Sequence, residues 1–197
     1  MQPDITNDKD PSPFHAGEQE LQTRTGKREA MEEFSRKIIR PFMPDEHRAF
    51  FNQLPYIVVG SVDRDGWPWA SIMSGSPGFI ESPDRKRLDI NATPLAGDPL
   101  HHAWTKDAPI GLLGIELATR RRNRLNASVR AADSDGLSLT VDQSFGNCPQ
   151  YIQTRPLNFV RDPAARSADA LVEPITSLAG EAQTTIEMAD TFFVASF

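Results

Sequence analysis

The sequence predicts a mostly β (α+β) fold, an antiparallel barrel or sandwich preceded by helices. Short apolar or alternating runs recur at regular spacing from Tyr56 onward, which is typical of strands. Two Asp-Gly turns, Asp63–Gly66 and Asp133–Gly136, separate pairs of these runs, and such turns join antiparallel strands. Helical spacing of apolar residues lies mainly before Tyr56.

Residues 1–45 are predicted to form an N-terminal extension and a helix. Apolar residues fall near helical spacing, with charged residues between them, over Gly17–Ile39. Pro41 and Pro44 end this pattern because proline lacks the backbone N–H that a helix interior needs. A second short helix is expected over Asp45–Leu54.

Residues 46–160 are predicted to form the β-rich domain. The expected strands are Tyr56–Val62, Trp67–Ser74, Phe79–Ile80, Arg87–Ile90, Pro109–Leu117, Arg120–Ala132 and Leu137–Phe145. Pro109–Leu117 is strongly apolar, so we expect a central position for it. Short helices are expected over Asp98–Trp104 and from Cys148 to Ile152, where a proline follows the first residue.

Residues 161–197 are predicted to hold a loop, a helix and the first strand of a second unit. The run 189–197 resembles the run 54–62, because both are apolar, both follow a helical segment and both end in a small–Ser–apolar triplet. This similarity suggests a duplicated architecture whose second unit starts at Thr191–Phe197. A chance match between two ordinary strands is the alternative.

Composition restricts the classes of function. A net charge of −6 argues against non-specific nucleic-acid binding, which needs a surplus of Lys and Arg. No apolar run approaches the roughly 20 residues of a membrane span. The single Cys148 fits a reducing, cytoplasmic location, and the four His residues show no metal-ligand spacing.

The first candidate segment for binding is Trp67–Ile80. Small residues cluster where a strand ends: Gly75 and Gly78 permit a close approach of a ligand to the backbone, and Ser71 and Ser74 offer hydroxyl groups. The structural alternative is a bulged strand end followed by a wide turn.

The second candidate segment is the arginine-rich run Thr119–Asn126. On a strand, side-chain alternation puts Arg120, Arg122 and Arg124 on one face. Neighbouring guanidinium groups repel one another unless an anion lies nearby, and the planar guanidinium is suited to phosphate. The alternative is a solvated edge strand paired with acidic residues of the same chain.

The third candidate segment is Ser144–Gln153, where a strand is followed by a predicted helix N-terminus, a natural place for an anion. A helix N-terminus can lower the pKa of a thiol such as Cys148. No His or Asp lies close in sequence to complete a catalytic dyad, so we name no catalytic residue.

Four of these runs carry a resemblance to a known family. Tyr56–Ile80, Ile110–Ile115, Arg120–Asn126 and Phe145–Ile152 resemble the pyridoxamine 5'-phosphate oxidase-like flavin-binding split-barrel proteins. The large, internally duplicated subgroup is the most similar, because its N-terminal Ser-Pro-Phe-His-x-Gly-Glu stretch also matches Ser12–Glu18.

The resemblance implies an antiparallel split β-barrel that forms a homodimer with FMN at its interface. It also implies a flavin-dependent oxidoreductase, with FAD, a deazaflavin or haem left open as the cofactor and a redox partner or fused reductase module in relatives. The positions that match the family's cofactor-binding segments are Ser71, Ile72, Met73, Ser74, Gly75, Asp98, Pro99, Arg120, Arg122 and Arg124.

The chain departs from the oxidase pattern at one place. The oxidases carry Arg and Lys on the strand that corresponds to Trp69–Ser76, whereas this chain has only Ser, Gly and apolar residues there. Neutralisation of a phosphate would then depend on the arginine-rich run alone. A flavin-free barrel half that serves as a structural and dimerisation module is therefore the alternative function.

Overall fold

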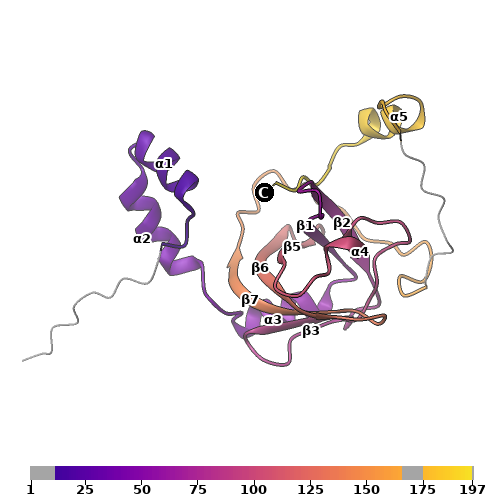
Figure 1. Ribbon diagram of the computed structural model, residues 1–197, viewed down its shortest axis with the longest axis horizontal. Helices are drawn as coiled ribbons and strands as arrows, with labels where there is room; N and C mark the ends of the chain where they lie inside the picture. The colour runs from indigo at the N-terminus through magenta and orange to yellow at the C-terminus, as the bar shows by residue number, and fades with distance from the viewer. Residues whose placement is uncertain (1–11, 166–174, 197) are drawn as a thin grey trace, which may run out of the picture. The chain divides into compact units, whose positions relative to one another are not determined.

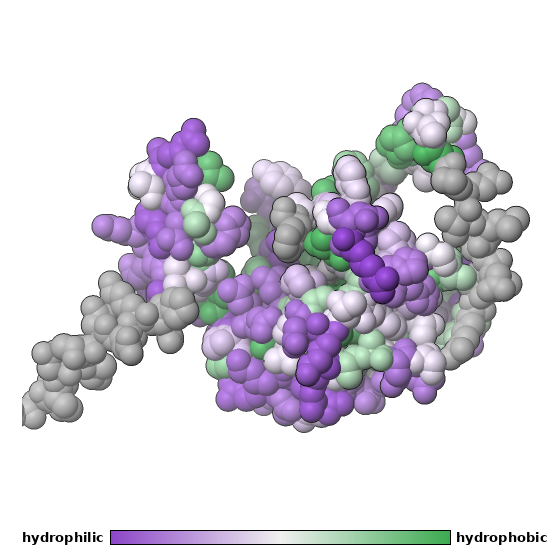
Figure 2. Space-filling model, viewed as in Figure 1, coloured by the Kyte–Doolittle hydropathy of each residue, from purple (hydrophilic) through white to green (hydrophobic). Residues whose placement is uncertain are grey.

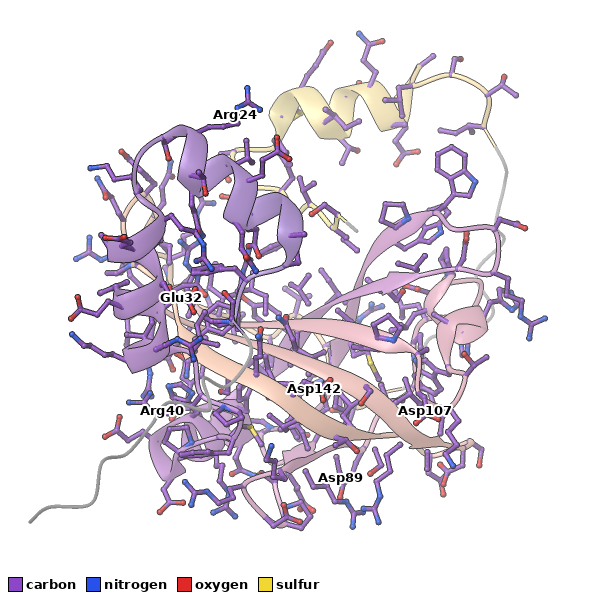
Figure 3. All side chains as sticks on the ribbon, turned by 60° about the vertical axis from the view of Figure 1, so that its left-hand side comes forward. Arg24, Glu32, Arg40, Asp89, Asp107 and Asp142 are labelled. Carbon is purple, nitrogen blue, oxygen red and sulfur yellow. The ribbon has the colours of Figure 1, made fainter. Side chains whose placement is uncertain are left out.

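The computed structural model describes residues 12–165 and 175–196 and divides at Arg40/Pro41 into two compact units (Figure 1). The first unit holds helices α1 (Ala16–Arg24) and α2 (Arg28–Ile38). The single helical pattern expected over Gly17–Ile39 is wrong in its middle, because Gly26 adopts a left-handed φ of 66° and separates the two helices. Glu32, labelled in Figure 3, forms ion pairs with Arg28 and Arg36 on α2.

The second unit is built on one antiparallel sheet. Its strands are β1 (Tyr56–Val62), β2 (Pro68–Ser74), β3 (Ile80–Glu81), β4 (Arg87–Ile90), β5 (Pro109–Glu116), β6 (Arg121–Ala132) and β7 (Leu137–Gly146). Their order is β2-β1-β5-β6-β7-β4-β3, so β5 is internal as expected. The sheet curls into a barrel that stays split between β2 and β3, and the predicted fold class, an antiparallel split β-barrel with N-terminal helices, is confirmed. The expected division into 1–45, 46–160 and 161–197 stays a prediction.

Side-chain alternation turns one face of the sheet toward the core. Val59 of β1, Leu112 of β5 and Leu125 of β6 are paired in register and are buried on this inner face. Helix α3 (Asp45–Gln53) covers the inner face with Phe50 and Phe51, whose rings meet edge to face at 5.9 Å between centroids. The short helix α4 (Leu100–Ala103) buries Leu100 in the same core.

The opposite, outer face of the sheet is also partly apolar. Val58 of β1 pairs with Leu113 of β5, and both point away from the core that Val59 and Leu112 form. Beside them Gly60 pairs with Gly111, which leaves bare backbone in the middle of the outer face. Outer-face apolar residues need a cover of their own, and the C-terminal part of the chain supplies some of it.

The structure corrects two local expectations. The helix expected over Cys148–Ile152 is a turn, because Tyr151 takes a left-handed φ of 70° and Ile152 N bonds back to Pro149 O at 3.3 Å. Arg120 does not belong to β6: it lies in the β5–β6 turn at φ 59°. Its side chain therefore does not share the strand face of Arg122 and Arg124.

The C-terminal part contains helix α5 (Glu181–Met188), within the segment expected to be helical. The strand expected over Thr191–Phe197 is absent from residues 191–196, which make no backbone ladder with other described residues, and Phe197 lies outside the described residues. These residues lie over the face of the sheet and not along an edge, so they cannot extend the ladder. The second-unit interpretation stays a prediction.

The two faces of β5 differ in how much space they leave, which a pair of substitutions tests. A Cβ added at Gly114 would lie 2.8 Å from Leu54 Cδ1 and 2.8 Å from Phe51 Cε1, whereas one added at Gly111 would meet nothing within 4 Å. Gly114→Ala should lower the free energy of unfolding by about 1–3 kcal/mol, the usual cost of overpacking. Gly111→Ala should change it by less than about 0.5 kcal/mol. Denaturant unfolding of both variants measures the difference, and equal effects would contradict the described packing.

Candidate functional site

A groove of about 820 Å³ lies on the outer face of β1, β5 and β6. Its floor includes Val58, Gly111 and Leu113, and its walls are residues 150–153 and 191–196. This volume falls within the range of about 300–1,000 Å³ that is common for small-molecule sites. The groove therefore joins three strands to two segments that are far apart in the sequence.

Arg122 and Arg124 extend over one side of this groove from β6. They pair with Ile115 and Leu113 of β5, so each guanidinium group stands beside an apolar neighbour. Two positions on the same face of a strand are separated by about 6.6 Å, which lets two guanidinium groups reach one anionic group. The two arginines form the cationic end of the groove.

The guanidinium group of Arg122 is incompletely satisfied. Its Nε is buried and no described residue accepts a hydrogen bond from it. A buried cationic N–H without an acceptor costs free energy, and a water molecule, an ion or a ligand oxygen can supply the missing acceptor. An anionic oxygen in the groove would satisfy this donor, and the residues present thus fit a phosphate.

Asp142 gives the groove an opposite charge farther along β7. A β-bulge, at which Gln143 faces Asn126 while Val141 faces Ala127, leaves Asp142, which is labelled in Figure 3, as the extra residue. Asp142 lines the groove, and partial burial raises the pKa of its carboxyl group. An anion bound in the groove is therefore favoured at Arg122 and Arg124 and disfavoured at the bulge.

The structure places several sequence-predicted site residues on the other side of the sheet. Ser71 is buried on the inner face, where its hydroxyl donates to Asp98 Oδ1 at 2.6 Å, and Leu100 N donates to the same oxygen at 2.8 Å. Met73 belongs to the core, and Pro99 precedes α4. This inner cluster positions α4 and does not reach the arginines.

The remaining predicted residues of β2 alternate with the inner ones. Ile72 lies on the outer face, where it pairs with Val58. Val58 pairs in turn with Leu113, and Leu113 pairs with Arg124. Ser74 is exposed and donates to Pro163 O at 3.3 Å, while Gly75 leaves space for the ring of Phe79. Of the predicted positions, the structure brings only Arg122 and Arg124 together in the groove.

Sequence reasoning missed both walls of the groove. Residues 150–153 overlap the short helix expected over Cys148–Ile152, and residues 191–196 belong to the strand expected over Thr191–Phe197. Residues 192–195 are apolar throughout, so the sequence carries no alternation that would show which side of this run packs on the sheet.

Two other kinds of site receive no support in the described part of the chain. No group of three or more His, Cys, Asp or Glu side chains is placed to hold a metal ion among residues 12–165 and 175–196. Cys148 is exposed and is not in a disulfide. None of the described helices combines the length and apolar character that crossing a membrane requires.

Among solved structures, the chain resembles HupZ of Group A Streptococcus, at 11% identity and a TM-score of 0.43 over 58% of this chain and 99% of that one. It also resembles an FMN-binding protein from Syntrophomonas wolfei subsp. wolfei, at 8% identity and a TM-score of 0.41 over 64% of this chain and 96% of that one. An F420 reductase is similar at 11% identity and a TM-score of 0.37, over 53% and 98% of the two chains. No protein-family model and no curated protein matches the sequence, so the comparisons establish no family.

The separation of the two clusters predicts separable effects. Ser71→Ala removes the 2.6 Å hydrogen bond to Asp98 and should lower the free energy of unfolding by about 1–3 kcal/mol, the range for a hydrogen bond to a charged group. Because Ser71 faces away from the groove, the substitution should leave the groove itself unchanged. Ser74→Ala, on the same strand, is the control and should cost less than about 0.5 kcal/mol. Urea unfolding of both variants measures the difference, and equal effects of Ser71→Ala and Ser74→Ala would contradict the described inner cluster.

Proposed function

We propose that the outer-face groove binds FMN and that the protein is a flavin-dependent oxidoreductase. The observation that carries the proposal is the buried Nε of Arg122, beside Arg124, for which residues 12–165 and 175–196 supply no hydrogen-bond acceptor. A phosphate dianion accepts hydrogen bonds from both guanidinium groups, and charge-assisted bonds of this kind are about twice as strong as neutral ones. The resemblance of the arginine-rich run to that of flavin-binding split barrels supports the same assignment.

The floor of the groove suits the other end of the ligand. Val58 and Leu113 supply apolar surface, and Gly111, where an added Cβ would meet nothing within 4 Å, lets a flat ring approach the backbone. An isoalloxazine ring is planar and largely apolar, with polar atoms along one edge. Asn126 lines the groove farther along β6 from the arginines, and its amide group, which donates a 2.9 Å hydrogen bond to Gln143 Oε1, lies beside such an edge.

A bound flavin would supply the redox chemistry, and the protein would bind and orient it. The choice among FMN, FAD and a deazaflavin depends on how many phosphate groups Arg122 and Arg124 can bind at their end of the groove. One terminal phosphate fits the two arginines, and Asp142 opposes a second anionic group at the other end. This charge arrangement favours FMN. We extend the proposal to a cytoplasmic homodimer that receives electrons from a separate donor.

A flavin-free dimerisation module is the second candidate function, and one observation favours it. Exposed apolar side chains surround the groove: Phe192 is 73% exposed, Val194 78% and Ile72 48%. Hydrophobic residues also gather on the visible side of α5 in Figure 2. A second copy would cover such a surface. Flavin absorbance of the purified chain, or its absence after incubation with FMN, separates the two functions.

The phosphate assignment predicts a selective loss of affinity. Arg122→Ala should weaken FMN binding by about 1–3 kcal/mol, the range for a lost charge-assisted hydrogen bond. Riboflavin, which lacks the phosphate, should bind the variant and the unaltered chain equally. Fluorescence titration with both ligands measures this difference.

Arg130→Ala is the matched control, because Arg130 is exposed on the same strand but lies outside the groove. It should leave both affinities unchanged. Equal loss of FMN and riboflavin in Arg122→Ala, or unchanged FMN affinity in both Arg122→Ala and Arg124→Ala, would refute the phosphate site.

A further inference from the structure

The C-terminal wall, defined here as residues 190–196, lies on the sheet with one side only. Phe193 and Ala195 are partly buried against the groove, whereas Phe192 and Val194 between them are largely exposed. This alternation is that of an extended chain resting on a surface. The wall is therefore a separate layer of backbone over β1 and β5.

The wall rests on the backbone of the sheet at a glycine, and not on side chains. A Cβ added at Gly60 would lie 3.8 Å from the Cβ of Ala195 and 3.7 Å from Gly111 O, so Ala195 rests over the space that Gly60 leaves. No backbone hydrogen bond joins residues 191–196 to the other described residues. A segment with few contacts and no ladder opens more easily than a strand.

An ion pair connects the wall to the other side of the groove. The Arg155 guanidinium donates a hydrogen bond to the Asp190 carboxylate and another, of 3.0 Å, to Gln153 Oε1. Gln153 lines the groove, so the pair links both walls. The hydrogen bond from Arg155 holds the pKa of Asp190 below its usual range, and the pair persists at neutral pH.

We propose that the C-terminal wall is a movable wall of the ligand site, held closed by the Arg155–Asp190 pair, and that it retains FMN by slowing its dissociation. The inference rests on the proposed function of the groove. It assigns Arg155 and Asp190 as positioning residues, because their ion pair holds the first residue of the wall and does not involve the arginines of the phosphate site. It also assigns Phe193 as the side chain that faces the bound ring from the wall.

The test measures FMN dissociation by stopped flow and hydrogen exchange of residues 190–196 by mass spectrometry, both on the full chain. Asp190→Asn should speed dissociation roughly two- to fivefold, the range of a partly exposed ion pair, with little change in the association rate. It should also speed hydrogen exchange of the wall without ligand. Arg155→Asp combined with Asp190→Arg should restore both rates, because the pair is re-formed with its charges exchanged.

The control is Glu33→Gln, which breaks the more exposed Glu33–Lys37 ion pair of α2 and should change neither rate. If Asp190→Asn slows dissociation, or speeds wall exchange without affecting FMN, the wall is not a retaining element and the inference is overturned. If the unaltered chain binds no FMN, the proposed function and this inference fall together. If FMN binds and dissociates identically in all variants, only the inference falls.

Discussion

The two-residue period of β6 is the constraint on which the rest of the barrel and its groove depend. Leu125, Ala127 and Val129 are buried on the inner face, and this burial fixes Arg122 and Arg124 on the outer face. A register slip of one residue would carry the arginines into the core and the apolar side chains into water. Because burying an unpaired charge costs far more than a slip could gain, the core of the barrel determines where the cations of the groove lie.

The same alternation places one glycine of β5 on the inner face of the sheet and another on the outer face, and each leaves space for packing. Gly114 gives inner space to Leu54 and Phe51, and Gly111 gives outer space beside Gly60. The inner gap is filled by α3, which closes the core. The outer gap is shared between the groove and the C-terminal segment, so the binding surface exists because the middle of the sheet carries no side chains there.

Most of the fold could be predicted because its strands carry local patterns. The strands around the Asp-Gly turns and the apolar β5 follow from alternation and turn chemistry, which act within a few residues. Gly26 and Tyr151 show where such patterns fail, since one left-handed residue ends a helix or prevents one without changing the apolar spacing. The strand predicted over Thr191–Phe197 was wrong for residues 191–196 for another reason. An apolar run can pack equally well along a sheet edge or over a sheet face.

The site was harder to predict because it depends on which face each residue takes. Consecutive residues of β2 cannot share one face, so Ser71 and Ile72 necessarily separate, and Ser71 joins Asp98 on the inner side. Arg122 and Arg124 are two residues apart and do share a face, so that part of the expectation has geometric support. Arg120 does not share a face with these two arginines, because it lies in the tight β5–β6 turn, which requires a left-handed residue at its position.

The unpartnered donor of Arg122 bears on both candidate functions. In the flavin-binding function a phosphate oxygen accepts its hydrogen bond. In the dimerisation function a second copy that covers the groove would bury Arg122 further, and it would then have to bring a carboxylate or carbonyl oxygen to Nε. Exposed Phe192 and Val194 supply apolar area to such an interface but no acceptor. A phosphate ligand would directly supply the acceptor that Arg122 Nε needs. A second copy would have to supply this acceptor and also cover the apolar surface. This difference favours the flavin-binding function.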